Sequence, residues 1–276
     1  FAANPLEPAY GKLGNGHCED PGLDPEDEAI QSAETGLLRS ARTDEWVTGR
    51  TGLVDVGARE RGFAFDAERP RHQQLLHPHA IASCNVTNAE WAEFIKDGGY
   101  RNSALWLSEG LDWLNREKIA AALYWNEDGT MFTLAGRREI DPAAPVAHIS
   151  YYEADAFARW AGARLPTEFE WEAFASSSDR RSGNQLDHAS AVLPRPGGGP
   201  FGDVWQWTQS AFAAYPGFKP VEGAVGEYNG KFMCGQFVLK GASCATPRGH
   251  SRASYRNFFP PSARWQFTGL RLARDC

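Results

Sequence analysis

The sequence predicts an α+β domain of low regular secondary-structure content. Three observations support this class: three helix starts marked by capping residues, short apolar runs typical of strands, and many turn-forming residues, 28 Gly and 17 Pro, between them. A chain of 276 residues can bury a sizeable core, and its 10 Trp and 16 Phe predict that this core is aromatic.

Each predicted helix begins where a Thr or Ser is followed three residues later by Glu. In such a capping box, the two side chains satisfy each other's free backbone N–H groups. The three boxes are Thr87 with Glu90, Ser150 with Glu153, and Thr167 with Glu170. Glycines predict the helix ends at 98–99 and at Gly162. We expect these helices to pack the core rather than to carry a functional site.

Two short runs, 236–239 and 270–272, are predicted strands. Apolar and other residues alternate over 269–273, which is typical of a half-buried strand. The preceding run NFFPP at 257–261 is not expected to be regular structure, because two prolines end it. With Arg264 close behind, rings, an amide and guanidinium groups are predicted to converge on a substrate pocket next to a core strand.

Composition excludes several classes of function. The net charge of −7 and the lack of a basic block argue against nucleic-acid partners and membrane surfaces. No apolar run approaches the roughly 20 residues that span a bilayer, and no signal peptide is visible. We therefore expect a soluble, cytoplasmic protein. Residues 1–45 are rich in Pro, Gly, Asp and Glu and predict a linker before a domain at 46–276.

Cysteine and histidine patterns predict no metal site in this chain. The five cysteines are widely spaced without a C-x-x-C pair, and we expect reduced thiols. The densest histidine cluster is His72, His77 and His79, and a His-x-His pair on a strand can chelate a metal. However, Pro78 separates that pair and no acidic residue or cysteine completes the set. The other histidines are single: His17, His148, His188 and His250.

Four ordered segments resemble the formylglycine-generating-enzyme (sulfatase-modifying factor) domain: 150–172, GDVWQWT at 202–208, 239–243 and 255–274. Within this superfamily the chain resembles the C-terminal domain of ergothioneine-biosynthesis sulfoxide synthases. The segments that carry this closer resemblance are 1–10, GGY at 98–100, LWLSEG at 105–110 and GEYNGKFM at 226–233. The resemblance implies the C-type-lectin-like architecture of the formylglycine-generating family.

This resemblance implies an oxidoreductase that uses non-haem iron(II) and O2 to form a C–S bond between hercynine, a trimethylated histidine, and cysteine or γ-glutamylcysteine. In the family, three histidines of an N-terminal helical domain bind the iron. The Fe(II) ligands are therefore expected outside this chain, and 1–45 is expected to be the linker or remnant that follows this missing domain, which would be a partner of the chain.

The resemblance also places Asn257, Phe258 and Phe259 at the mouth of the iron site, where they would help to hold hercynine and the thiol donor. The chemistry of these side chains agrees with that role. Aromatic faces attract a quaternary ammonium group, an Asn can pair with an imidazole or a carboxylate, and Arg264 suits a carboxylate. We therefore predict Asn257, Phe258, Phe259 and Arg264 as substrate-binding residues.

Three alternatives remain open. Some relatives carry Trp-Asp where this chain has Phe258 and Phe259, so the donor could also be a selenosugar, as in the similar selenoneine synthases. A formylglycine-generating cysteine oxidase needs a cysteine pair after Gly241, whereas only Cys244 is present, at the position of an aromatic core residue. A non-catalytic lectin-like binding module is disfavoured by the intact NFFPP run.

Two further features of the family are not expected here. Its structural calcium sites lie around the 202–208 segment, where Asp203 and Gln206 depart from the usual charge pattern and argue against calcium. A tyrosine donates a proton in the family, and Tyr228 and Tyr255 could do so. In relatives with the Phe-Phe form, however, the resemblance implies that this tyrosine belongs to the N-terminal domain. No catalytic residue is therefore assigned in this chain.

Overall fold

A computed structural model describes residues 45–276 except 135, 188–191 and 224–229. The described residues form four α-helices and eleven β-strands, which confirms the α+β class. The helices are α3 (Asn88–Lys96), α4 (Ser108–Glu117), α5 (Tyr151–Trp160) and α6 (Glu168–Ala175). The strands are β1 (Trp46–Thr48), β2 (Gly52–Val56), β3 (His72–Leu76), β4 (His79–Ala82), β5 (Thr130–Thr133), β6 (Gly136–Glu139), β7 (Trp205–Ala211), β8 (Phe237–Gly241), β9 (Asn257–Phe259), β10 (Thr268–Leu270) and β11 (Ala273–Asp275). Tyr228 and the predicted linker, except Glu45, lie outside the described residues.

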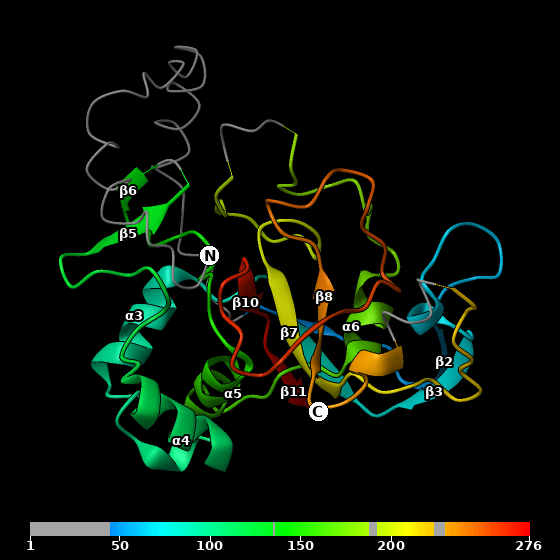
Figure 1. The fold of residues 1–276 in the computed structure, drawn as a ribbon, viewed down its shortest axis with the longest axis horizontal. Coiled ribbons are helices and arrows are strands. Elements are labelled where there is room, and N and C mark those ends of the chain that lie inside the picture. Colours follow the sequence, from blue (N-terminus) through cyan, green and yellow to red (C-terminus); the bar gives the residue numbers. More distant parts are fainter. Residues whose placement is uncertain (1–44, 135, 188–191, 224–229) are drawn as a thin grey trace.

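A four-stranded sheet in the order β10-β7-β8-β9 forms the centre of the molecule (Figure 1). Its β10 runs parallel to β7, whereas the other two pairs are antiparallel. A three-stranded sheet, β1-β4-β11, and two ribbons, β2-β3 and β5-β6, complete the strands. In Figure 1, α3, α4 and α5 lie on one side of the central sheet, and α6 and the β2-β3 ribbon on the other.

The three capping boxes occur where the sequence predicts them. The backbone N–H of Ser150 donates to Glu153 Oε2 over 2.8 Å, and the N–H of Glu153 donates to Ser150 Oγ over 3.2 Å. Equivalent boxes at Thr87 and Thr167 start α3 and α6. Helix α4 was not predicted, because its N-cap is Leu107 and no side chain caps it.

The C-terminal strand prediction needs a correction. Strand β10 ends at Leu270 and β11 begins at Ala273, so 271–272 link two strands of different sheets instead of continuing one strand. All residues from Thr268 to Ala273 are buried, not alternately buried and exposed. The apparent alternation arose from Arg271, which is fully buried and donates to Gln206 Oε1 over 3.0 Å and to the carbonyl of Ala82 over 2.7 Å.

The core is aromatic, as expected from the composition. Trp91 of α3 stacks on Phe157 of α5 with ring centroids 5.1 Å apart and planes 10° apart. Trp207 of β7 is fully buried, and its indole N–H donates to the carbonyl of Ile149 over 2.9 Å. The first contact packs α3 on α5, and the second fixes the N-terminal end of α5 against the central sheet.

One end of the central sheet brings distant segments together. In the register of the sheet, Trp205 at the start of β7 lies opposite Gly241 at the end of β8 and beside Thr268 at the start of β10. Strand β9 begins at the same end, where Asn257 pairs with Leu239. The segments that enter and leave these strands therefore surround a common space. Over the described ranges, no helix has the length and apolar character needed to cross a membrane.

Candidate active site

A cavity of about 460 Å³ lies at this end of the sheet. It is bounded by the segments next to β7, β8, β9 and β10, by the β5-β6 hairpin and by the segment before α5. The described residues that line it are Tyr124, Met131, Phe132, Thr133, Leu134, His148, Leu193, Trp205, Ser243, Ala245, Thr246, Tyr255, Asn257, Trp265, Gln266 and Phe267.

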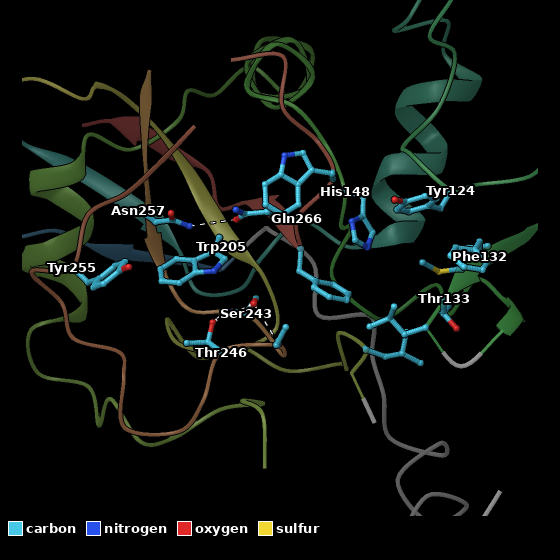
Figure 2. A pocket seen from close by; sticks show the side chains of 16 residues that line it. Tyr124, Phe132, Thr133, His148, Trp205, Ser243, Thr246, Tyr255, Asn257 and Gln266 are labelled. Atoms are coloured by element: carbon cyan, nitrogen blue, oxygen red, sulfur yellow. Dashed lines mark hydrogen bonds between the residues drawn. The ribbon is translucent and has the colours of Figure 1, made fainter. Parts of the chain in front are cut away.

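The two ends of the cavity differ in composition (Figure 2). At the Asn257 end, defined by Asn257, Gln266, Trp205 and Tyr255, two amides lie beside two rings whose centroids are 5.4 Å apart. At the His148 end, defined by His148, Tyr124, Phe132 and Phe267, the rings of Tyr124 and Phe267 lie 5.0 Å and 4.7 Å from the imidazole. No Lys, Arg, Asp or Glu occurs among the described lining residues, so the cavity is aromatic and uncharged at neutral pH.

Asn257 is the predicted site residue that lines the cavity. Its Nδ2 donates to Oε1 of Gln266 over 3.4 Å, and its Oδ1 accepts from the backbone N–H of Phe258 over 3.0 Å. The contact with Gln266 is long for a hydrogen bond. A ligand can therefore compete for either amide.

Phe258 and Phe259 lie outside the cavity wall. The expectation of irregular structure at this point was wrong, because Asn257–Phe259 form β9, and successive side chains of a strand point to opposite faces. Phe258 consequently packs on the other face, stacked on Phe212 at 4.0 Å and 9°. Phe259 contacts Trp265, a lining residue, with centroids 5.3 Å apart. Phe259 thus contacts the wall from behind.

Arg264 is buried behind the cavity and does not line it. Its guanidinium donates to the carbonyl of Ala121 over 2.6 Å and lies 3.5 Å from a carboxylate oxygen of Glu153. The predicted four residues are therefore near one another in the fold, but only Asn257 faces the cavity. A substrate-binding role of Phe258, Phe259 and Arg264 stays a prediction.

Tyr255 lines the Asn257 end and is fixed from outside by Arg252. The Arg252 guanidinium lies 5.0 Å from the Tyr255 ring, and its Nε donates to Glu68 Oε2 over 2.8 Å. Ser254 Oγ donates to the same carboxylate oxygen over 2.7 Å. This buried carboxylate therefore anchors the segment that leads into β9.

His148 and Gln266 were missed by the sequence analysis. His148 is a single histidine, and no other typical metal-ligating residue lies next to it in the sequence. Its backbone is left-handed, with φ of 61°, and a sequence does not predict this conformation for a residue other than glycine. Burial lowers the pKa of its imidazole to about 4. Gln266 belongs to no recognisable sequence motif, and only the fold brings it opposite Asn257.

The predicted histidine cluster does not converge. His72 packs between rings, 4.5 Å from that of Tyr215, whereas His77 is exposed and His79 is buried 3.9 Å from Glu170. Within the described ranges, no group of three His, Cys, Asp or Glu side chains could hold a metal ion. These residues do not fit an iron site.

The side chains expected near a family calcium site, those of Gln206 and Asp203, make hydrogen bonds within the protein. Gln206 Oε1 already accepts from Trp171 Nε1 over 2.7 Å and from Arg271 Nε, and its amide N–H donates to the carbonyl of Pro200 over 2.9 Å. Asp203 Oδ1 accepts from Asn184 and from the backbone N–H of Arg195. Protein donors therefore already occupy Gln206 Oε1 and Asp203 Oδ1, two oxygens that could otherwise bind a hard cation.

The four described cysteines are free thiols. Cys84 and Cys244 are buried, and Cys234 and Cys276 are exposed. Burial raises the pKa of the Cys244 thiol well above its ordinary range, so this side chain stays protonated and unreactive. As expected from its position, Cys244 is a core residue.

The chain is thus an α+β domain with an aromatic cavity at one end of a small mixed sheet. The chain belongs to the sulfatase-modifying factor enzyme 1-like domain family, whose sequence model matches residues 36–191 and 200–276. The solved structure of PvdO from Pseudomonas aeruginosa has the same fold, with a TM-score of 0.54 and 19% identity over 84% of this chain and 94% of that chain.

Two curated relatives are more similar in sequence. The hercynine oxygenase of Mycolicibacterium thermoresistibile is 36% identical over 260 residues, which are 81% of this chain and 56% of the relative. The hercynine oxygenase of Mycobacterium tuberculosis is 37% identical over 251 residues, 81% of this chain and 59% of the relative. The chain therefore spans somewhat more than half the length of these proteins.

Proposed function

We propose that this chain is the C-terminal domain of an ergothioneine-biosynthesis sulfoxide synthase. This enzyme is an oxygenase that uses iron(II) and O2 to join hercynine to a thiol donor. The observation that carries the proposal is the uncharged aromatic cavity with Asn257 in its wall. Similarity to two hercynine oxygenases supports the substrate assignment.

The cavity suits hercynine in size and chemistry. Its volume of about 460 Å³ lies within the usual range of small-molecule sites. A quaternary ammonium group cannot donate a conventional N–H hydrogen bond and is recognised by aromatic rings, and the wall contains Trp205 and Tyr255. The amides of Asn257 and Gln266 can bond polar groups of the acceptor. Cysteine or γ-glutamylcysteine is the proposed thiol donor, and a selenosugar is the alternative.

Iron is expected from a second part of the enzyme, because the described residues do not fit it. We propose that an N-terminal helical domain with three histidines faces the cavity and holds Fe(II). When bound, this iron would activate O2. The part of the present chain is to bind and orient the acceptor and to exclude water. Asn257 would contact substrate, and Phe258, Phe259 and Arg264 would hold the wall in place. A cytoplasmic location stays a prediction.

Cysteine oxidation to formylglycine is less well supported. That reaction requires an accessible thiolate pair, whereas Cys244 is buried, protonated and unpaired among the described residues. The family relationship therefore explains the fold and not this chemistry.

The test is a reconstituted reaction. The chain is joined to the helical part of a hercynine oxygenase and supplied anaerobically with Fe(II). Hercynine and O2 are then added with cysteine, γ-glutamylcysteine or a selenosugar in parallel. Mass spectrometry should detect one sulfoxide or selenium adduct that depends on hercynine and O2. An inactive complex that nevertheless converts a sulfatase-motif peptide to an aldehyde would overturn the proposal in favour of formylglycine formation.

A further inference from the structure

The β2-β3 ribbon is apolar on both of its faces. On the inner face, Val54 and Leu76 belong to a buried cluster with Ala173 of α6. On the outer face, Leu53 and Leu75, here called the leucine pair, are 67% and 52% exposed. An antiparallel sheet with one face in water usually alternates apolar and polar residues, whereas apolar residues on both faces are typical of a sheet that is covered on both sides. The outer face therefore lacks the polar character of a surface that only water covers.

The leucine pair forms one continuous patch. Leu53 lies directly opposite Leu75 in the register of the ribbon, and the Cβ atoms of such a pair are roughly 5 Å apart. Single exposed apolar side chains need no explanation, but adjoining ones on a flat face indicate a contact surface. Each leucine is more than half exposed in the part of the chain that the structure describes. We therefore expect the covering group to come from outside this part of the chain.

The ribbon is fastened to the body of the domain. Gly57, which follows β2, donates its backbone N–H to Glu172 Oε1 of α6 over 2.7 Å. The other carboxylate oxygen of Glu172 accepts from Nζ of the fully buried Lys240 in β8 over 3.1 Å. The carbonyl of Gly57 accepts from Arg71, which precedes β3, over 2.8 Å. The outer face is thus held in place, and a partner that binds there has few groups to order.

The charges around the leucine pair favour a second copy of the chain as the partner. Asp55 lies at one end of the outer face, and Arg50 and His77 lie at the other end, all exposed. A two-fold axis through the leucine pair places the acidic end of one copy against the basic end of the other and brings the leucines together. Charged groups then surround an apolar centre, as in ordinary protein interfaces. Asp55 Oδ2 lies 3.6 Å from Arg71, and both side chains are exposed, so the carboxylate can take a second cation.

We propose that the outer face of the β2-β3 ribbon is a self-association surface, on which two copies of the chain pack face to face about a two-fold axis. The ribbon lies on the side of the central sheet away from the β5-β6 hairpin, which borders the cavity (Figure 1). Association therefore leaves the cavity open, and the inference does not depend on the proposed function. The face is smaller than the roughly 800 Å² that each partner of a standard interface buries, so we expect a weak dimer with a Kd of about 10 to 100 µM.

The experiment is sedimentation equilibrium of the chain between about 5 and 500 µM, which brackets the expected Kd. The wild type should change from monomer to dimer over this range. Leu53→Glu should raise the Kd at least about tenfold, because it removes apolar contacts and places like charges close to the two-fold axis. Thermal melting verifies that the variant is folded, as expected for a substitution at an exposed position.

Two further sets of variants separate this surface from a general effect of charge. Val47→Glu changes an exposed apolar residue of a different sheet, 41% exposed on β1, and should leave the Kd within about twofold of the wild type. Asp55→Arg and Arg50→Asp should each weaken the dimer. The double variant should recover most of the loss, because the new arginine of one copy meets the new aspartate of the other. A partner other than a second copy gives no such recovery.

Two outcomes would overturn the inference. One is a wild type that stays monomeric at the highest concentration, and the other is a dimer that Leu53→Glu leaves intact. In the first case, hydrogen exchange of 52–56 is measured in the chain alone and in the chain joined to the helical part of a hercynine oxygenase. Protection that appears only in the joined protein would show that this part, and not a second copy, covers the leucine pair.

Discussion

Arg264 and Glu153 form an ion pair across 3.5 Å inside the protein, with side chains 8% and 0% exposed. Glu153 also accepts hydrogen bonds from the hydroxyl groups of Tyr100 and Ser150, each over 2.7 Å. The segment that precedes β10 is therefore fastened to the first turn of α5. Because 265–267 line the cavity, this ion pair supports the wall from behind.

Replacing Arg264 by Met should lower the free energy of unfolding by about 3 kcal/mol, because it leaves the charge of Glu153 buried and uncompensated. Denaturant titration measures this change. Adding Glu153→Gln should recover part of the loss, so the double variant should be more stable than the two single effects predict.

Arg159→Met is the matched control, because Arg159 pairs with Asp155 at the surface of α5, the helix that contains Glu153. It should cost less than about 1 kcal/mol. If Arg264→Met were as stable as the wild type but failed to bind hercynine, Arg264 would be a substrate residue rather than a support.

Asn257→Ala and Phe258→Ala should separate binding from packing. Asn257→Ala should reduce the affinity for hercynine about two- to tenfold with little change in stability, since its amide faces the cavity. Phe258→Ala should cost about 2 to 3 kcal/mol in stability, less than a fully buried Phe, because Phe258 is half-buried against Phe212. Calorimetry and denaturant titration measure the two effects. The reverse outcome, a stable Phe258→Ala that loses selectivity for trimethylated over unmethylated histidine, would place Phe258 at the ammonium group.

Acid should destabilise the fold partly through His148. Its pKa falls from 6.5 to about 4 on folding, so the unfolded chain takes up a proton at a pH where the folded chain does not. The stability due to the neutral ring is therefore complete above pH 6.5 and declines as the pH falls toward 4, by about 3 kcal/mol in all. Denaturant titrations at pH 7, 5.5 and 4.5 should show this decline in the wild type and a shallower one in His148→Asn. Parallel curves would show that the imidazole is hydrated in the folded state.

The isolated chain should not retain stoichiometric iron. The described residues hold no group of three metal-ligating side chains, and His72, His77 and His79 point into different environments. Metal analysis after anaerobic loading with Fe(II) and desalting should give far less than one iron per chain. One tightly held iron, lost in His77→Asn or His79→Asn, would contradict the placement of the iron in another domain.

Thiol reagents should distinguish the cysteines of the folded chain. Cys234 and Cys276 are exposed and should react within minutes, whereas Cys84 and Cys244 should react only after unfolding, because burial keeps their thiols protonated. Mass spectrometry of labelled peptides gives the sites. Rapid labelling of Cys244 in the native protein would reopen the cysteine-oxidase alternative.

Elements with a local sequence signal were predicted correctly, whereas features that depend on contacts between distant segments were not. The capping boxes at Thr87, Ser150 and Thr167 are complete within four residues, so all three helix starts were predicted. Helix α4 starts without a side-chain cap and was missed. Arg271 was interpreted as an exposed strand position because it is charged. In the structure it is buried, and it hydrogen-bonds to Gln206 and to backbone carbonyls.

The same contrast holds for the residues of the candidate site. The run at 257–261 was recognised as unusual, but the alternation of β9 determines that Asn257 and Phe258 face opposite sides. His148, Gln266 and Tyr124 come from segments more than a hundred residues apart at the extremes. Backbone hydrogen bonds from Leu123 to His148 and from Ile149 to Thr268 hold these segments together. A single sequence does not predict that these three residues come together.

The passage of the chain from β10 to β11 couples the edges of two sheets. β10 is an outer strand of the central sheet and β11 is an outer strand of the β1-β4-β11 sheet, and only residues 271–272 separate them. A local opening that detaches this segment would therefore expose the edges of β7 and β4 to neighbouring chains at the same time.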